Sequence, residues 1–224
     1  DRTPFNVPFQ SIESRFIGRD ETLSKLRTEL ENGQVVHTGP CVLIEGMGGM
    51  GKSQLAVEYA HKFRKEYPGG VLWFVANEKA DPQLARFAID QLGYPEEDKD
   101  ESLAAMTRLW MNANKDYLLI LDNLDDEEES EDFLPKEHKN YHLIGTARER
   151  FSADWNPLSL DELSSEDAQL LLVEYMAGYG RDFLGSPEVA ELSQALQRHP
   201  LALELAGRYM CKVELAPSKY LDIF

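Results

Sequence analysis

One stretch of eight residues combines groups that can hold a chain of phosphates. It contains four glycines followed by a lysine and a serine, and its residues are Gly46, Met47, Gly48, Gly49, Met50, Gly51, Lys52 and Ser53. Because glycine adopts backbone conformations that other residues avoid, successive N–H groups of such a loop can turn inward around an anion. The spacing G-x-x-x-x-G-K-S adds an ammonium group for the β- and γ-phosphates and a hydroxyl for Mg²⁺. The stretch therefore predicts a nucleotide-binding P-loop, with Lys52 on the phosphates and Ser53 on the metal.

The residues on either side of this loop have the pattern that a P-loop requires. Before it, CVLIE (residues 41–45) is a short apolar run typical of a strand buried on both faces. After it, apolar residues recur at helical spacing from Ala56 to Phe63. A helix that begins at Gly51 adds its unpaired N–H groups and its dipole to the phosphate site. The predicted nucleotide-binding residues therefore continue to Gln54.

A second chemical group comes at the end of another apolar run, YLLILD (residues 117–122). Because the carboxyl ends of parallel strands share one edge of a sheet, Asp122 is predicted to complete the Mg²⁺ site with Ser53. The next residue is Asn123, whose amide cannot take a proton from water near neutral pH. Hydrolysis of the γ-phosphate is therefore expected to be slow, unless one of the aspartates at 125–126 acts as the base.

The run LIGTAR (residues 143–148) is a further apolar strand, and it ends in Thr146 and Arg148. In a parallel sheet this strand end faces the same phosphates, where a guanidinium can report whether a γ-phosphate is present. An isolated arginine is more often an ordinary surface residue, so this sensor role depends on the topology of the sheet. The residues predicted to act on the phosphates are Lys52, Asp122, Asn123 and Arg148.

Apolar runs of strand length alternate with segments of helical period over the first two thirds of the chain. The predicted strands are 41–45, 71–76, 117–122 and 141–147, and the predicted helices include 20–33, 82–92 and 101–113. Such alternation is typical of βαβ units and a mainly parallel sheet between helices. From about Leu163 only helical periods remain. The sequence therefore predicts an α/β fold, a P-loop NTPase three-layer sandwich with a mainly parallel sheet, followed by a small all-helical subdomain.

These elements predict three segments along the chain. Residues 1–16, with prolines among aromatic residues, are expected to form an extended arm. Residues 17–157 are expected to form the nucleotide-binding domain, and residues 158–224 the helical subdomain. Because the sequence does not begin with Met, it is expected to be a piece of a longer protein.

Composition narrows the class of partner and the compartment. The 224 residues carry a net charge of −17, and so acidic a surface repels phosphate backbones, which disfavours nucleic acid. The two cysteines fit a reducing compartment and no disulfide or zinc framework. His138 and His142 have i,i+4 spacing, but the incomplete motif favours a surface loop over a metal site. With no apolar run of about 18 residues and no signal-peptide core, a soluble cytoplasmic protein is expected.

Five blocks of the sequence resemble, in order and spacing, those of one family. They are FIGR (16–19), GMGGMGKS (46–53), LLILDNLDD (118–126), GTAR (145–148) and HPLAL (199–203). Together they resemble the NB-ARC subgroup of STAND P-loop ATPases, found in plant disease-resistance proteins, apoptosome-forming adaptors and fungal NLR-like receptors. The resemblance extends over nearly the whole chain. It departs at Asn123, where many members have a second aspartate, and at His199, where glycine is usual and where we expect only the turn to change.

The resemblance implies an adenine nucleotide, ADP or ATP, bound together with Mg²⁺. In the family the first block lies against the adenine, and the proline of the last block touches it. By position, this assigns a nucleotide-binding role to Phe16, Ile17, Gly18, Arg19, Pro200 and Leu201. Guanine fits less well, because the N-K-x-D motif of GTPases is matched only by Asn77-Glu78-Lys79-Ala80-Asp81, with one residue inserted and too early in the chain.

The resemblance also implies a signalling switch of the kind that acts in innate immunity and programmed cell death. In such a switch ADP holds a resting state and ATP favours an open state that self-associates, while hydrolysis is slow. The family's winged-helix domain, its effector domain and its repeats are expected outside these residues. Two other functions stay open: an AAA+-type motor with steady ATP turnover, and a STAND-type regulator that binds DNA. Turnover kinetics separates the motor from the switch, and neither the charge nor any recognition helix favours the regulator.

Overall fold

The computed structural model describes residues 3–32, 35–36, 39–96, 99–124, 128–136, 140–149 and 155–223, which form two compact units. The first, which we call the sheet unit, comprises Asp1–Ser11, Leu23–Gly46 and Lys52–Ser159. The second, the helical unit, comprises Ile12–Thr22, Met47–Gly51 and Leu160–Phe224. The chain therefore passes from one unit to the other at each end of the glycine-rich loop. The division into three consecutive segments stays a prediction.

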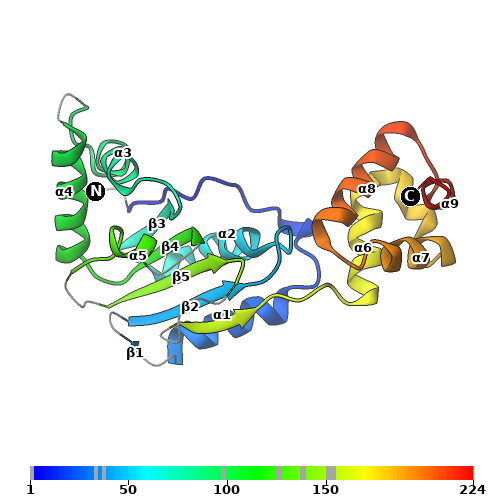
Figure 1. Ribbon diagram of the computed structural model, residues 1–224, viewed down its shortest axis with the longest axis horizontal. Helices are drawn as coiled ribbons and strands as arrows, with labels where there is room; N and C mark the ends of the chain where they lie inside the picture. The colour runs from blue at the N-terminus through cyan, green and yellow to red at the C-terminus, as the bar shows by residue number, and fades with distance from the viewer. Residues whose placement is uncertain are drawn as a thin grey trace. The chain divides into compact units, whose positions relative to one another are not determined.

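The sheet unit is built on six strands in the order β1-β2-β5-β4-β3, with β6 paired to β2. The strands are β1 (Val35–Val36), β2 (Gly39–Glu45), β3 (Gly70–Val75), β4 (Tyr117–Leu124), β5 (Tyr141–Ala147) and β6 (Asn156–Ser159). All their pairings are parallel except that of β1 with β2. Figure 1 shows β2 and β5 side by side, with their arrows pointing the same way. The predicted mainly parallel sheet is confirmed.

The helices follow the pattern that the sequence predicts. They are α1 (Asp20–Asn32), α2 (Lys52–Phe63), α3 (Ala80–Leu92), α4 (Asp100–Ala113), α5 (Glu128–Glu131), α6 (Ser165–Tyr175), α7 (Pro187–Ala195), α8 (Pro200–Val213) and α9 (Pro217–Leu221), with short 3₁₀ helices at Glu13–Arg15, Arg64–Glu66 and Ala177–Phe183. The helix after the glycine loop begins at Lys52, one residue later than predicted. Within the described ranges, no helix combines the length and the apolarity that a membrane span requires.

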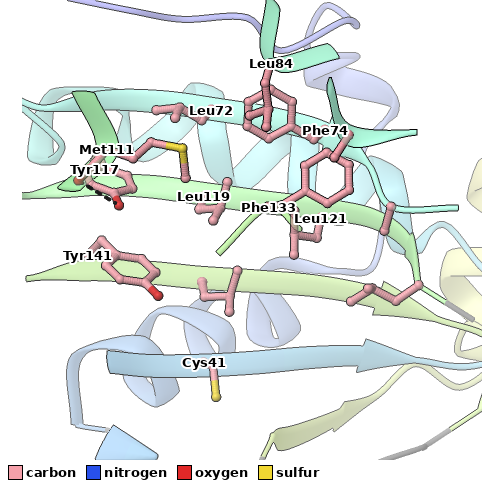
Figure 2. Close-up of a cluster of buried hydrophobic side chains, with 14 of the residues drawn as sticks. Cys41, Leu72, Phe74, Leu84, Met111, Tyr117, Leu119, Leu121, Phe133 and Tyr141 are labelled. Carbon is pink, nitrogen blue, oxygen red and sulfur yellow. Dashed lines mark hydrogen bonds between the residues drawn. The ribbon is translucent and has the colours of Figure 1, made fainter. Parts of the chain in front are cut away.

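Side chains on one face of the sheet pack against α3 and α4. Leu72 and Leu119 belong to the same buried cluster as Leu84 of α3 and Met111 of α4 (Figure 2). Because side chains alternate between the two faces of a strand, the intervening residues point to the opposite face, and they are buried as well. There α2 contacts β4 and β5. Burial on both faces explains why these strands are continuous apolar runs in the sequence.

Two strands of the sheet carry little strand signal in the sequence. β1 is only two residues long, and β6 has the sequence NPLS, in which Pro157 lacks a backbone donor. A proline is tolerated here because β6 pairs with β2 and with no other described strand, so one side of it needs no partner. Ser159 at the end of β6 donates a hydrogen bond to Glu45 Oε1 (2.7 Å), at the last residue of β2. β6 thus supports the residue that precedes the glycine loop.

The segment Pro4–Asn6, close to the beginning of the described chain, lies along the outer edge of β3. Phe5 forms a parallel bridge with Val71, whose N–H donates to Pro4 O and whose carbonyl accepts from Asn6 N–H. The Asn6 side chain continues this pattern, since it accepts from Trp73 N–H (2.8 Å) and donates to Trp73 O (2.9 Å). A side-chain amide thus takes the place of a peptide group and satisfies the exposed edge of the sheet.

The helical unit has its own buried core, formed mainly by α6, α7 and α8. Two of these helices begin with a serine cap, because Ser164 accepts a hydrogen bond from Asp167 N–H and Ser186 accepts one from Val189 N–H. α6 and α8 pack closely at Gly207, where a Cβ atom would lie 2.7 Å from Tyr175 Cβ. The helical elements predicted after Leu163 are confirmed.

His142 in β5 belongs to a buried chain of hydrogen bonds in the sheet unit. Its Nδ1 lies 2.8 Å from the Tyr67 hydroxyl, which lies 2.9 Å from the Tyr59 hydroxyl. Burial raises the pKa of Tyr59 to about 12 and raises that of Tyr67 further. Burial also lowers the pKa of His142, against the opposing effect of nearby carboxylates. The surface loop predicted for His142 is therefore wrong, because this residue lies in β5 and its ring contacts the buried Tyr67 hydroxyl. His138 lies outside the described residues.

This lowered pKa predicts how stability changes in mild acid. Below the ordinary histidine pKa of 6.5, the unfolded chain takes up a proton that the folded chain resists, so the free energy of unfolding falls as pH drops. His142→Asn keeps a hydrogen-bonding side chain but does not titrate. We expect its free energy of unfolding to fall less than that of the wild type between about pH 7 and about pH 5. Urea denaturation across this range measures the difference, and parallel curves would contradict the assignment.

Candidate nucleotide-binding site

The sheet unit brings the carboxyl ends of three strands to one edge. β2 ends at Glu45, directly before the glycine-rich loop, and α2 begins at Lys52, directly after it. β5 lies between β2 and β4, and its register pairs Ile44 with Thr146. Asp122 near the end of β4 therefore lies one strand beyond Thr146, on the same edge as the start of α2.

Three oxygen-bearing side chains meet at this edge. Ser53 Oγ donates to Asp122 Oδ1 (2.7 Å), and Thr146 Oγ1 donates to the same oxygen (2.6 Å). These two hydrogen bonds orient the carboxylate of Asp122. Asp122 and Thr146 are both buried. A serine hydroxyl beside a carboxylate supplies the hard oxygen ligands that Mg²⁺ prefers, so the predicted pair of Ser53 and Asp122 fits this ion.

A β-bulge fixes the direction of Asp122. Leu121 pairs with Gly145 and Leu124 pairs with Ala147, so two residues of β4 lie opposite the single Thr146 of β5. The second of them, Asn123, has a φ of 61° and donates its N–H to Thr146 Oγ1 (3.0 Å). Asparagine adopts this left-handed conformation more readily than most residues. Asn123 therefore has a conformational role, in addition to leaving the position without a second carboxylate.

Lys52 lies at the start of α2 and is held within the sheet unit. Its Nζ donates to the carbonyl oxygen of Gly46 (2.6 Å), so the side chain folds back toward the end of β2. Burial lowers the pKa of Lys52, the positive charge of Arg148 lowers it further, and Asp122 partly opposes both effects. Lys52 and Arg148 therefore lie close enough to repel one another, and an anion beside them would relieve this repulsion; the phosphate site stays a prediction.

The middle of the glycine-rich loop is held by the first turn of α8, within the helical unit. His199 Nε2 lies 2.9 Å from Gly48 O, and Leu201 N–H donates to Gly49 O (3.3 Å). Gly49 has a φ of 77°, and a Cβ atom there would lie 2.6 Å from the His199 ring. Only glycine both adopts this positive φ readily and leaves room for the His199 ring. Met50 N–H closes a turn on Met47 O (3.4 Å), so the loop is a defined structure.

The block Phe16–Arg19 also belongs to the helical unit. Ile17 packs against its core, and Gly18 lies so close to Asp167 that a Cβ atom would be 2.6 Å from the carboxyl carbon. Arg19 donates to Asp161 O (2.6 Å), and burial lowers its pKa against the attraction of two aspartates. Pro200 is the first residue of α8. The adenine-binding roles of these residues and of Leu201 stay predictions.

The structure also shows what the sequence did not assign. Thr146 orients Asp122, and His199 contacts the loop, although its replacement of glycine was expected to change only the turn. The sequence signal for the role of Thr146 is its position one residue before the end of β5. Gln54, which the sequence predicts to be part of the phosphate site, donates a hydrogen bond from its side-chain amide to Glu58 Oε1 (2.8 Å). The alternative bases at 125–126 lie outside the described residues.

A glycine-rich loop joins a parallel strand, β2, to a helix, α2. The serine at the start of this helix is hydrogen-bonded to an aspartate on β4, which lies two strands from β2 in the sheet. This arrangement defines a P-loop NTPase. Comparison with known families gives the same class in finer detail, because residues 19–174 match the model of the NB-ARC domain. This match covers more than half of the chain. The chain belongs to the NB-ARC family.

A relative and two solved structures are consistent with this assignment. The chain is 26% identical to a nucleotide-binding leucine-rich repeat (NLR)-like protein of Hyaloscypha variabilis, over 98% of this chain and 24% of that protein. It therefore spans about a quarter of that relative's length. The structure resembles a Walker-type ATPase of Pyrococcus abyssi, with a TM-score of 0.63 at 11% identity over 95% of this chain and 72% of that one. It also resembles the Thermotoga maritima RuvB Holliday junction branch migration motor, with a TM-score of 0.55 at 17% identity over 96% and 71%. At such identities these likenesses show the fold alone.

Proposed function

We propose that this chain is the module that binds ADP or ATP with Mg²⁺ in an NLR-like signalling protein, where it acts as a switch. The observation that carries the proposal is the Ser53–Asp122 hydrogen bond at the start of α2, beside Lys52. Main-chain amides of the loop and Lys52 hold the phosphates, while the two oxygen-bearing side chains hold the metal. The assignment to NB-ARC favours adenine as the base.

The nucleotide carried by the purified protein tests this proposal most directly. Protein is denatured immediately after purification, and the released small molecules are identified by mass spectrometry. ADP or ATP in near-stoichiometric amount supports the proposal and identifies the resting state. A guanine nucleotide would refute the base assignment. If no nucleotide is released and calorimetry detects no binding of added ADP, the proposal fails.

The switch reading rests on slow hydrolysis, because Asn123 replaces a second carboxylate beside Asp122. An amide orients water but does not accept its proton, so turnover is expected to be slower than about one event per minute. A motor of AAA+ type would instead hydrolyse ATP continuously. Multiple turnovers within seconds by this chain would favour the motor over the switch.

Discrimination between ADP and ATP is proposed to depend on Arg148. This exposed residue follows directly after β5, near enough to Lys52 for its charge to lower the lysine pKa. A ligand shifts a switch only through contacts that differ between its states, and the γ-phosphate is what distinguishes the two nucleotides.

We expect Arg148→Ala to weaken ATP binding about tenfold and to change ADP binding by less than about twofold. Calorimetry with each nucleotide and Mg²⁺ measures both affinities. Arg86→Ala serves as the control, because Arg86 is an exposed arginine of α3 that pairs with Asp90. Equal losses for ADP and ATP in the Arg148 variant would remove its sensor role.

We further propose that ATP favours self-association in the full-length protein, and that effector and repeat domains accompany this module in the cytoplasm. The support is the family and the NLR-like relative, of which this chain covers only a part. Size-exclusion chromatography of the longer protein with ADP and with a non-hydrolysable ATP analogue tests the nucleotide dependence of its oligomeric state.

A further inference from the structure

We propose that His199 is a positioning residue that sets the conformation of the phosphate-binding loop through its hydrogen bond to Gly48. This inference rests on the proposed function, because it concerns how the same loop binds phosphates. It goes beyond that function by giving a role to a residue that neither the P-loop motif nor the predicted site includes.

The hydrogen-bonding partners of His199 determine which of its nitrogens carries the proton. Nδ1 lies 3.4 Å from the backbone nitrogen of Ala202, whose N–H can only donate. Nδ1 is therefore the acceptor, and it caps the first turn of α8. In the neutral ring the proton then resides on Nε2, which donates to Gly48 O (2.9 Å). One imidazole thus joins the start of α8 to the loop.

This hydrogen bond determines the direction of a loop amide. The peptide unit is planar and trans, so Gly48 C=O and Gly49 N–H point in opposite directions. When His199 holds the carbonyl, it also holds the Gly49 N–H pointing away from the imidazole. Leu201 N–H donates to Gly49 O and restrains the next peptide unit in the same way. Two consecutive peptide units are thus held by the first turn of α8.

Such restraint matters because the loop is rich in glycine. Glycine loses more conformational freedom than any other residue when it is ordered, so a loop with four glycines is costly to fix around a ligand. A loop whose amides are already directed before the ligand arrives binds more tightly, since that cost has been met during folding. Removal of the His199–Gly48 bond should therefore weaken phosphate binding without removing any group that touches phosphate.

Two substitutions separate this role from helix capping. Asparagine places its side-chain oxygen near the position of Nδ1, so His199→Asn keeps the cap of α8 but does not reach Gly48. Glutamine places its amide nitrogen near the position of Nε2, so His199→Gln can still donate to Gly48 but does not cap the helix.

We expect His199→Asn to bind ADP about fivefold more weakly and to retain the wild-type melting temperature. We expect His199→Gln to bind ADP within about twofold of wild type and to melt at a lower temperature. Calorimetry with ADP and thermal unfolding without ligand measure the two effects. Wild-type ADP affinity in the asparagine variant, or equal losses in both variants, would overturn the inference.

A measurement without nucleotide keeps this test separate from that of the proposed function. ¹⁵N NMR of the imidazole in the ligand-free chain should show the proton on Nε2 and the lone pair on Nδ1. The Gly49 amide resonance should shift in the asparagine variant more than in the glutamine variant. A ring protonated at Nδ1, or an unchanged Gly49 amide, would overturn the inference. If the wild type itself fails to bind ADP, the proposed function is refuted, while the NMR result still decides whether the hydrogen bond orders the loop.

Discussion

Lys52→Ala is expected to weaken the binding of both ADP and ATP by more than about 100-fold. A lysine ammonium forms charge-assisted hydrogen bonds with two phosphates, each stronger than a neutral hydrogen bond. In the described fold, Lys52 Nζ donates to Gly46 O, while burial and the positive charge of Arg148 lower the lysine pKa, so its surroundings disfavour the ammonium form. The fold therefore depends little on this charge, and the free energy of unfolding is expected to change by less than about 1 kcal/mol.

The matched control is Lys62→Ala, because Lys62 is an exposed lysine on the same helix, α2. It should bind both nucleotides as the wild type does. Calorimetry gives the affinities, and urea denaturation shows whether each variant is folded. If Lys52→Ala is folded and binds ADP with wild-type affinity, the glycine-rich loop is not the phosphate site.

Asp122→Asn is expected to remove most of the contribution of Mg²⁺ to ATP binding. The amide oxygen can still accept the hydrogen bonds that Ser53 and Thr146 donate, so the local structure should survive. Without the negative charge, however, affinity for the metal should fall by about 10- to 100-fold or more. Titrations of ATP at several Mg²⁺ concentrations measure this effect, and ADP binding without Mg²⁺ should be unchanged or tighter.

A second variant separates the role of the charge from the role of the fold. Asp122→Ala removes the acceptor of two hydroxyls at a buried position, and it should therefore destabilise the sheet unit by about 1–3 kcal/mol. Both variants should lose the Mg²⁺ effect, but only the alanine variant should lose stability. Asp132→Asn, at an exposed carboxylate, is the control for a general change in charge. Undiminished dependence on Mg²⁺ in Asp122→Asn would exclude this carboxylate from the metal site.

The sequence predicts those parts of this site whose signal lies in residues that are neighbours along the chain. The loop signal lies in eight neighbouring residues, and Asp122 follows directly from a buried strand. Thr146 and His199 act instead on partners 24 and 151 residues away. Contacts of this kind depend on which strand lies beside which and where a helix begins. The position of Thr146 near the end of a strand hints at its role, whereas nothing in the sequence around His199 indicates a contact with the loop. The sequence does not predict β6, because a four-residue edge strand that contains a proline resembles a turn in composition.

Asn123 shows how one residue can be interpreted correctly for one property and incompletely for another. From the sequence it is a chemical departure, an amide where a second acid is usual. The structure adds that this position has a left-handed backbone at a bulge, and that its N–H supports Thr146. Asn123→Asp would therefore test the effect of a second carboxylate without straining the backbone, because aspartate also tolerates this left-handed conformation. A β-branched residue at this position would disturb the bulge itself.

The pairing of Pro4–Asn6 with the edge of β3 has a mechanical consequence. These hydrogen bonds lie side by side along a parallel strand, and Asn6 contributes two of them through its side chain. Tension applied along the strand axis to the chain ahead of Pro4 loads all of them together in shear, rather than one after another as in peeling. A pull from that direction is therefore transmitted into the central sheet, at the strand that lies next to the one carrying Asp122.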